Sequence, residues 1–358
     1  MSLLLTENQQ EFQETVRSLF EKRLTSQRVR GIQDAFVDFD RETWAEVAEL
    51  GAAGVLVPEE YDGLGLGLTD ASVVMEETGR VIAPLPLYTA LLASAAIAAT
   101  DDDEAKAELL PAIAAGESIV ALAFTEGNQS WIPTAPSVTG GATVSGTKTF
   151  VRDGQFADHL LVLANDGLYL VANGEGVTAS ALKVLDRSVF AAKVEFTSAP
   201  ARKLAVSDLA AFLDHVDSVA SILLASAQYG AYVKEAEVST QYAKDRFQFG
   251  RSIGSFQGVK FPLADMATES ELAYSLLRRA TEAADAGEDE FRIAALAVQV
   301  KMQGLSWAGA GRMARIHGGI GFTWDHDSHL FMKQGKTSQL LLGTPGNRSE
   351  KLAVALGV

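Results

Sequence analysis

Apolar and polar residues follow three successive patterns along the chain. Up to about residue 117 the apolar residues recur at helical spacing, and from 118 to 205 they recur at about every second position. Helical spacing returns from 206 to the end. Because helices and strands are segregated along the chain, the pattern predicts an α+β multidomain protein: a helical domain over 1–117, a β-domain over 118–205 and a helical bundle over 206–358.

Local signals predict where several elements begin and end. Thr6 to Gln9 match a capping box, which starts a helix. Asp166-Gly167 stands between two apolar runs and predicts a β-hairpin. The stretch 207–248 predicts one helix of about 40 residues, far above the usual length. Gly287 is a stop signal between the two helices that follow.

Composition and charge limit the possible ligands. Of the 358 residues, 47% are hydrophobic, and 46 acidic residues oppose 30 basic ones, for a net charge of −16. The whole excess lies in residues 1–200, which hold 29 acidic and 13 basic residues, whereas residues 201–358 hold 17 of each. Such a field repels phosphate backbones and anionic membranes, so we expect no nucleic acid partner, and any polyanionic ligand on the C-terminal part.

Other sequence features exclude some chemistry and indicate a compartment. The chain has no Cys, hence no disulfide, thiolate metal site or Cys nucleophile. Its N-terminus lacks the basic region and long apolar stretch of a signal peptide, so we expect a cytoplasmic protein. The longest uncharged runs, 81–100 and 218–233, are interrupted by Pro or by Ser, Gln and Tyr, and neither predicts a membrane span.

Three motifs carry candidate chemistry, each with a structural alternative. The segment 246–257 has two Arg, two Gly and three Phe, which suit a phosphate-bearing ligand or, equally, a helix C-cap. The glycine loop 317–322 resembles a phosphate cradle, but it follows a helix rather than a strand, so close packing explains its glycines as well. Asp214-His215-x-Asp217 lacks a second His, and we expect no metal. The acidic pairs Glu59-Glu60 and Glu76-Glu77 are expected to be capping or surface charges.

Five segments, in this order, resemble the motifs of one known protein family over essentially the whole chain. Pro58–Gly65 is similar to the family's PEEYGGLG turn, Thr125-Glu126 to its TEP strand end, and Ser145–Lys148 to its NGSK turn. Arg246–Gln257 resembles the RxQFGxxIGxFQ signature, and His317–Thr323 resembles the HGGxGFT loop. The chain thus resembles the acyl-CoA dehydrogenase family. The resemblance implies an N-terminal helical domain, a middle β-barrel or sandwich and a C-terminal four-helix bundle, assembled as dimers or tetramers.

The resemblance also implies a cofactor, a substrate and site residues. Family members bind FAD at a subunit interface and oxidise an acyl-CoA thioester in β-oxidation and related lipid metabolism, with electron-transfer flavoprotein as a possible acceptor. A carboxylate removes the α-proton while the β-hydrogen leaves as hydride. Carried over residue by residue, the FAD contacts fall on Arg246, Phe249, Gln257, Arg315, Gly318, Gly319, Thr125 and Arg152.

Departures from the family pattern concern the catalytic base. The family's usual Glu falls on Leu342, and the alternative position on the long helix falls on Ala220, followed by Ser221 in place of an Arg. Arg152 stands where a Thr or Ser usually contacts the flavin. The flavin loop after Thr125 is replaced by Glu126-Gly127-Asn128-Gln129-Ser130-Trp131.

Three hypotheses follow from the missing base. The chain is a subunit of a heteromeric acyl-CoA dehydrogenase whose second, related chain supplies the base; its length and Leu-Leu-Gly ending resemble actinobacterial-type members that act on large CoA thioesters, including steroid side chains. Alternatively, the base is relocated to Asp217, one turn before Ala220. A third possibility is a non-catalytic binding or scaffold homologue, or a flavin monooxygenase of the same fold.

Overall fold

The computed structural model describes residues 4–127 and 131–358. Its internal contacts divide the chain into two units. Unit 1 contains the N-terminal residues as far as Arg30, Ser72–Ala83 and Ser221–Val358, and unit 2 contains Gly31–Ala71 and Pro84–Ala220. The predicted order of helical, sheet and helical segments is confirmed, while the two domain boundaries at 117 and 205 stay a prediction.

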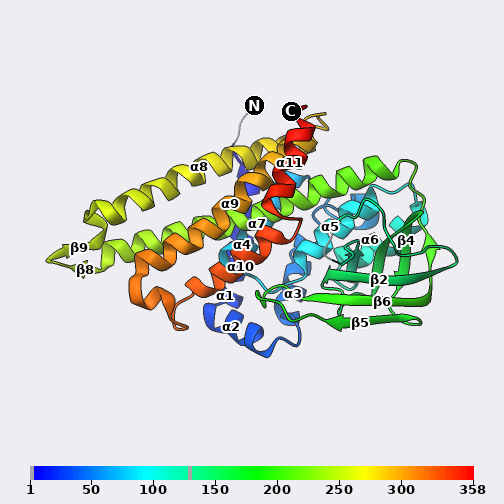
Figure 1. Ribbon diagram of the computed structural model, residues 1–358, viewed down its shortest axis with the longest axis horizontal. Helices are drawn as coiled ribbons and strands as arrows, with labels where there is room; N and C mark the ends of the chain where they lie inside the picture. The colour runs from blue at the N-terminus through cyan, green and yellow to red at the C-terminus, as the bar shows by residue number, and fades with distance from the viewer. Residues whose placement is uncertain (1–3, 128–130) are drawn as a thin grey trace. The chain divides into compact units, whose positions relative to one another are not determined.

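The first segment is helical, as expected (Figure 1). The predicted capping box is present, because Thr6 accepts a hydrogen bond from the Gln9 amide and Gln9 accepts one from the Thr6 amide. Asp40 and Asp102 cap two later helices more simply, because each carboxylate accepts one backbone amide, that of Thr43 and that of Ala105. The elements are α1 (Glu7–Arg23), α2 (Ser26–Ala35), α3 (Arg41–Glu49), η1 (Ala52–Gly54), η2 (Glu59–Tyr61), α4 (Leu68–Val81), α5 (Leu87–Ala98) and α6 (Asp103–Ala114).

Two sheets form the middle segment in unit 2. Their strands are β1 (Val120–Ala123), β2 (Thr143–Arg152), β3 (His159–Ala164), β4 (Gly167–Ala172), β5 (Val177–Ala181), β6 (Ala191–Pro200) and β7 (Arg202–Lys203). One sheet has the order β1-β3-β4-β7, with β1 parallel to β3, and the other has the antiparallel order β2-β6-β5. The predicted hairpin at Asp166-Gly167 is confirmed, because Ala164 pairs with Gly167.

Long helices make up the C-terminal segment (Figure 1). The predicted long helix is α7, of 37 residues, and its distal end is joined to α8 by a short β-hairpin. Gly287 lies just after the C-cap of α8 and has φ +64°, a left-handed conformation that suits the stop signal predicted between the two helices. The elements are α7 (Leu209–Asp245), β8 (Phe247–Gln248), β9 (Arg251–Ser252), η3 (Ile253–Ser255), α8 (Gln257–Asp285), α9 (Phe291–His317), η4 (Gly318–Phe322), α10 (Ser328–Leu340) and α11 (Pro345–Ala355).

Helix α7 packs closely against α4 in unit 1 at two glycines. A Cβ on Gly79 would lie 1.8 Å from the carbonyl oxygen of Ala227, and a Cβ on Gly230 would lie 1.8 Å from that of Glu76. Any side chain at either position would therefore separate the helices. Among the described residues α7 alone has the length and hydropathy of a membrane span, and 67% of its most apolar window is buried inside the protein.

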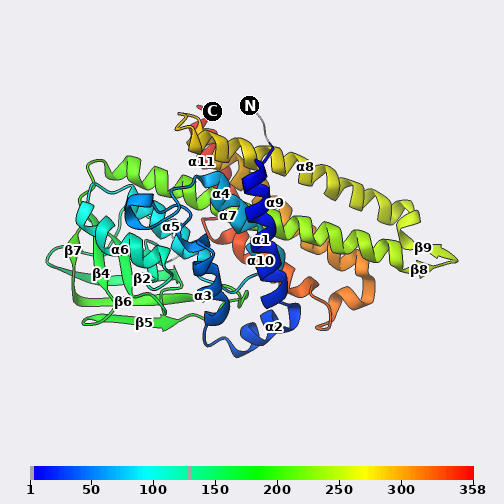
Figure 2. The same ribbon diagram turned by 180° about the vertical axis from the view of Figure 1, so that it is seen from behind.

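The expectation that Glu76-Glu77 are capping or surface charges was wrong. Both side chains are buried on α4, which lies beside α1 (Figure 2). Glu77 forms a 2.8 Å ion pair with Arg17 of α1, and Glu76 pairs with the buried Arg278 of α8. Glu59-Glu60, in contrast, lie exposed at the start of η2. The fold tolerates the burial of Glu76 and Glu77 because each carboxylate has a guanidinium partner.

Candidate functional site

The end of strand β1 is joined to α7 through Trp131, in unit 2. Thr125 donates a 3.1 Å hydrogen bond from Oγ1 to the Trp131 carbonyl, and the indole stacks on Phe124 with ring centroids 6.0 Å apart. The indole Nε1 donates to Oδ1 of Asp217 at 2.8 Å, and Asp217 is buried. Asp217 therefore fixes the tryptophan. Asn128, Gln129 and Ser130 of the predicted replacement loop lie outside the described residues.

The TEP-like and NGSK-like segments meet in a buried ion pair. Lys148 Nζ lies 2.6 Å from Glu126 Oε1, and Ser137 donates to the other carboxylate oxygen from its amide and its hydroxyl. Burial acts to raise the pKa of Glu126, but the ammonium of Lys148 and the bonds from Ser137 outweigh it and lower that pKa to about 2. Burial lowers the pKa of Lys148 in turn. The pair fixes the strand end beside Thr125.

Arg152, at the end of β2, lies on an aromatic platform in the same unit. Its guanidinium is 4.5 Å from the centre of the Tyr88 ring, and its Nε is 3.8 Å from Oδ2 of Asp153. The Tyr88 hydroxyl donates to the carbonyl of Ala220 at 3.2 Å, which connects this cluster with α7. Burial raises the pKa of Asp153 to about 6, although Arg152 and a 2.5 Å bond from Thr89 act to lower it.

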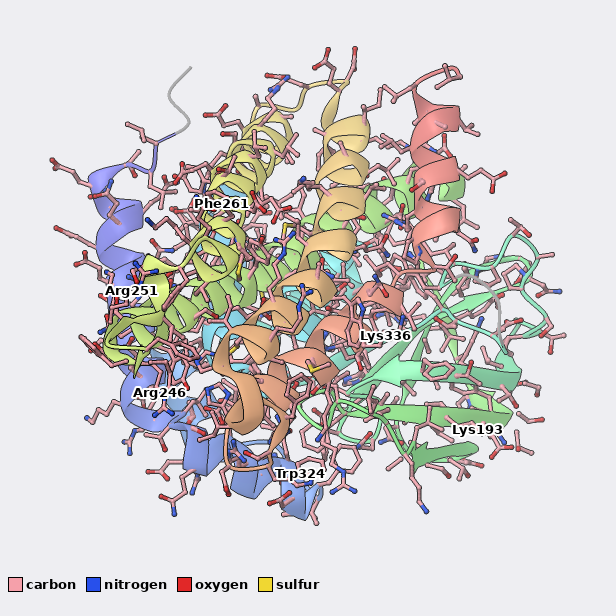
Figure 3. All side chains as sticks on the ribbon, turned by 60° about the vertical axis from the view of Figure 1, so that its left-hand side comes forward. Lys193, Arg246, Arg251, Phe261, Trp324 and Lys336 are labelled. Carbon is pink, nitrogen blue, oxygen red and sulfur yellow. The ribbon has the colours of Figure 1, made fainter. Side chains whose placement is uncertain are left out.

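The Arg246–Gln257 segment forms the hairpin end of the α7–α8 pair in unit 1 (Figure 3). Arg246, Phe249 and Gln257 are all exposed, and Phe249, with φ +54°, keeps 92% of its surface accessible. Arg251 lies over the Phe256 ring at 4.0 Å. Two cations and exposed aromatic rings thus gather at one end of the bundle, an arrangement that suits an anionic, aromatic ligand.

The glycine loop follows α9 in unit 1. Gly318 has φ +64°, and nothing lies within 4 Å of a Cβ added at Gly318 or Gly319, so neither is required by close packing. A Cβ on Gly321 would lie 2.5 Å from the Ala314 carbonyl oxygen, so the packing explanation holds for that glycine alone. Arg315 is exposed on the last turn of α9, where its charge and the free backbone can meet a ligand.

His317 is held inside the same loop. Its ring stacks on Tyr242 of α7 at 4.3 Å, and its Nδ1 lies 2.8 Å from the Met313 carbonyl. Burial lowers the pKa of His317, although the Met313 contact acts to raise it. The Tyr242 hydroxyl also donates to the His317 carbonyl at 3.4 Å, so the end of α7 and the glycine loop are connected.

The two predicted base positions are apolar and buried. Leu342 is 3% exposed and Ala220 is fully buried. The sequence did not reveal a buried cation beside Ser221, the residue that follows Ala220. Arg348 of α11 donates a hydrogen bond to the Ser221 hydroxyl in unit 1. Ser221 stands where family members are expected to carry an arginine, and no motif on the last helix marked Arg348 as its substitute.

The structure thus brings the predicted residues together in separate groups. In unit 2, Thr125 and Asp217 share Trp131, while Arg152 and Ala220 share Tyr88. In unit 1, Arg246 and Phe249 lie in the hairpin with Gln257 at the start of α8, and Arg315, Gly318 and Gly319 lie at the end of α9. Within residues 4–127 and 131–358, no group of three or more His, Asp or Glu side chains is placed to hold a metal ion.

A helical segment, a sheet segment and a helical bundle with an aromatic and cationic hairpin define a class of flavoprotein. Two family models match the chain: acyl-CoA dehydrogenase, N-terminal domain, over residues 6–117, and acyl-CoA dehydrogenase, C-terminal domain, over residues 219–354. The chain belongs to the acyl-CoA dehydrogenase family, whose members are FAD-dependent oxidoreductases of β-oxidation and related pathways. The exposed arginines and aromatic rings of the site fit FAD, an aromatic polyanion.

Individual relatives cover almost the whole chain. It is 30% identical over 349 residues to acyl-CoA dehydrogenase IpdE2 of Mycolicibacterium smegmatis, covering 97% of this chain and 98% of that protein. Among solved structures, the Tcur3481-Tcur3483 steroid ACAD G363A variant has a TM-score of 0.88 and 32% identity, with 98% of each chain covered. The ChsE4-ChsE5 complex from Mycobacterium tuberculosis has a TM-score of 0.90 at 24% identity, which shows a shared fold.

Proposed function

We propose that this chain is a base-deficient subunit of a heteromeric, FAD-dependent acyl-CoA dehydrogenase, in which a second chain of the same family supplies the catalytic carboxylate. The complex introduces an α,β double bond into an acyl-CoA thioester. The observation that carries the proposal is the pair of buried hydrocarbon side chains, Leu342 and Ala220, at the two positions where the family pattern expects the base.

Loss of the α-proton needs an acceptor of that proton, and neither Leu nor Ala offers one. General-base catalysis typically contributes about 10²–10⁴-fold to a rate, so a chain without a base would be nearly inactive alone. Asp217 is the remaining candidate on α7. Its carboxylate accepts the indole N–H of Trp131 and is 2% exposed, which supports a role in holding the loop instead of meeting substrate.

Eight residues of this chain are assigned to FAD. When bound, FAD supplies the acceptor for the hydride that leaves the β-carbon. Arginine guanidinium groups pair with phosphate oxygens, aromatic rings cover the ring system, and backbone at glycines approaches closely. The assigned residues are Arg246, Phe249 and Gln257 at the hairpin, Arg315, Gly318 and Gly319 at the end of α9, and Thr125 and Arg152 at the strand ends.

The relatives support the choice of partner and substrate class. The name of the Tcur3481-Tcur3483 relative joins two proteins and describes a steroid ACAD, and the ChsE4-ChsE5 structure is a complex. Both names support a pairing of two different chains. We therefore assign a large acyl-CoA thioester, with a steroid-derived acyl group as the first candidate. Electron-transfer flavoprotein is the proposed electron acceptor and the cytoplasm the proposed compartment, since the relatives are enzymes of this family and most of the apolar window of α7 is buried.

The decisive experiment compares this chain alone with this chain co-expressed with the dehydrogenase-like product of a neighbouring gene. We expect little dehydrogenation by the chain alone, and flavin absorbance with dehydrogenation of steroid-derived acyl-CoA by the pair. In the active pair, Asp217→Asn should keep its activity, because an Asn carbonyl still accepts the Trp131 N–H.

Three outcomes would contradict the proposal. An active homomer that Asp217→Asn inactivates would place the base on α7. Flavin-dependent oxygenation without turnover of CoA thioesters would favour a monooxygenase of the same fold, and a pair without flavin or activity would favour a scaffold.

A further inference from the structure

Arg152 is a largely buried cation, and no residue that the structure describes accepts a hydrogen bond from it. Its side chain is 20% exposed, and its contacts are the Tyr88 ring at 4.5 Å and the Asp153 carboxylate at 3.8 Å. A separation of 3.8 Å is too long for a hydrogen bond. Within the described residues the guanidinium therefore has five N–H donors and no hydrogen-bonded acceptor, whereas Arg202 in the same unit reaches Asp102 and Glu108 at 3.0 and 2.9 Å.

The carboxylate beside Arg152 accepts no hydrogen bond from it. Oδ2 of Asp153, the oxygen nearest Arg152, already accepts the Thr89 hydroxyl at 2.5 Å. Asp153 is 3% exposed, and burial raises its pKa to about 6, so its charge is costly in this position. The arrangement holds a cation in place while leaving its donors for another group.

The platform under the guanidinium fixes its direction. Tyr88 carries Arg152 on its ring and is itself anchored by a hydroxyl bond to the Ala220 carbonyl, 3.2 Å away. A guanidinium stacked on a ring keeps its N–H groups in the plane, free to donate at its edge to a planar acceptor. This edge is the part of the side chain that can meet a bound ring system.

We propose that Arg152 is a charge-tuning residue of the flavin site, which donates to an acceptor edge of the bound isoalloxazine and raises the flavin's reduction potential, and that Tyr88 and Asp153 are positioning residues for it. The inference rests on the proposed FAD site. Reduction by two electrons and one proton leaves a flavin one unit more negative, so a fixed cation favours the reduced form. A neutral Thr or Ser in this place offers a hydrogen bond without the charge.

The test measures the midpoint potential of FAD bound to the assembled protein, by equilibration with a reference dye. Arg152→Gln should lower the potential by about 30 mV, the equivalent of a tenfold loss of preference for the reduced form in a two-electron couple. Arg152→Lys keeps the charge and should lose less. Tyr88→Leu removes the platform and should shift the potential in the same direction, whereas Tyr88→Phe keeps the ring and should not.

Arg202→Gln is the matched control, because it removes a cation of the same unit that is paired within the chain, and it should leave the potential unchanged. A folded, flavin-loaded Arg152→Gln protein with the wild-type potential would overturn the inference. The same holds if Arg152→Lys shifts the potential as far as Arg152→Gln. If no form of the protein takes up FAD, the proposed cofactor site fails together with the inference, whereas flavin uptake without dehydrogenation contradicts the proposed activity alone.

Discussion

Arg348 of α11 and Ser221 of α7 are joined by a hydrogen bond between two buried side chains. Ser221 stands beside Ala220, at the position where the family pattern expects an arginine next to a base. Arg348 on the last helix thus places a guanidinium beside position 221, where the family pattern expects one on α7 itself. Gly343, next to Leu342, packs near it, since a Cβ there would lie 3.9 Å from Arg348 Cδ.

The first prediction concerns the strength of this contact. Hydrogen bonds to charged groups contribute about 1.5–3 kcal/mol, so Ser221→Ala should lower the free energy of unfolding by about 2 kcal/mol in urea titrations. Ser226→Ala is the matched control: it lies on the same helix, is equally buried and loses a neutral bond to Ser72 at 2.9 Å. Equal losses in the two variants would mean that the charge of Arg348 adds nothing.

A second prediction addresses the buried pair of Lys148 and Glu126. Lys148→Met leaves a carboxylate buried without its cation, and should destabilise the protein by about 3–5 kcal/mol. The double variant Lys148→Met/Glu126→Leu removes both charges and should recover part of this loss. The comparison is a double-mutant cycle by urea unfolding, and additive losses would show that the two groups act independently.

The low pKa of Glu126 predicts that the contribution of this pair to stability is lost in acid. Because its pKa in the folded chain is about 2, below the unfolded value, the pair contributes stability that is present above about pH 4.5 and is lost as pH falls toward 2. Glu126→Gln should therefore flatten the fall of the free energy of unfolding between pH 4.5 and 2. An unchanged slope would assign acid unfolding to other carboxylates.

Asp153 should give stability a pH dependence opposite in sign to that of Glu126. Its pKa is about 6 in the folded chain and about 3.8 when unfolded, so the unfolded chain ionises first as pH rises. Stability should fall between about pH 4 and 6 by about 3 kcal/mol and then level off. Asp153→Asn removes this fall while keeping an acceptor for Thr89. Urea titrations from pH 4 to 7 measure it, with the exposed Asp158→Asn as control, and a curve parallel to wild type would contradict it.

Local signals predicted the elements well, because their causes are local. The Thr6 capping box, the Asp166-Gly167 hairpin and the length of α7 each follow from residues within a few positions of one another. The close-packing explanation of the glycine loop applies to one of these three glycines: Gly321 is required by a close contact, whereas Gly318 and Gly319 are not.

The sequence could not show the burial or the hydrogen bonds of several acidic residues, because their partners lie far away along the chain. Glu76 and Glu77 read as surface charges, because Arg278 and Arg17, which make their burial possible, lie on other helices. The sequence offers Asp217 as a candidate base, but it does not show that the indole of Trp131, 86 positions away, donates to this carboxylate. A pattern on one helix reports which residues share a face, and not which side chain meets them from another helix.

The last prediction concerns a buried acid that no partner explains. Glu235 of α7 is fully buried in unit 1, and neither carboxylate oxygen has a hydrogen-bond partner among the described residues. Its Oε2 packs against Gly309, where an added Cβ would lie 2.2 Å away. The nearby Tyr232 hydroxyl is committed to Glu269 at 2.5 Å. Burial therefore raises the pKa of Glu235 well above its usual range.

An acid with a raised folded pKa contributes stability at low pH that is lost as pH rises. Above about pH 4.5 the unfolded chain ionises while the folded Glu235 stays neutral, at a cost of about 1.4 kcal/mol per pH unit. Glu235→Gln removes this cost, so its advantage over wild type in urea titrations should grow as pH rises above about 5. Glu237→Gln, on the same helix but exposed and facing Arg80, should show no such growth. A constant difference between Glu235→Gln and wild type would mean that Glu235 is ionised inside the fold and has found a partner there.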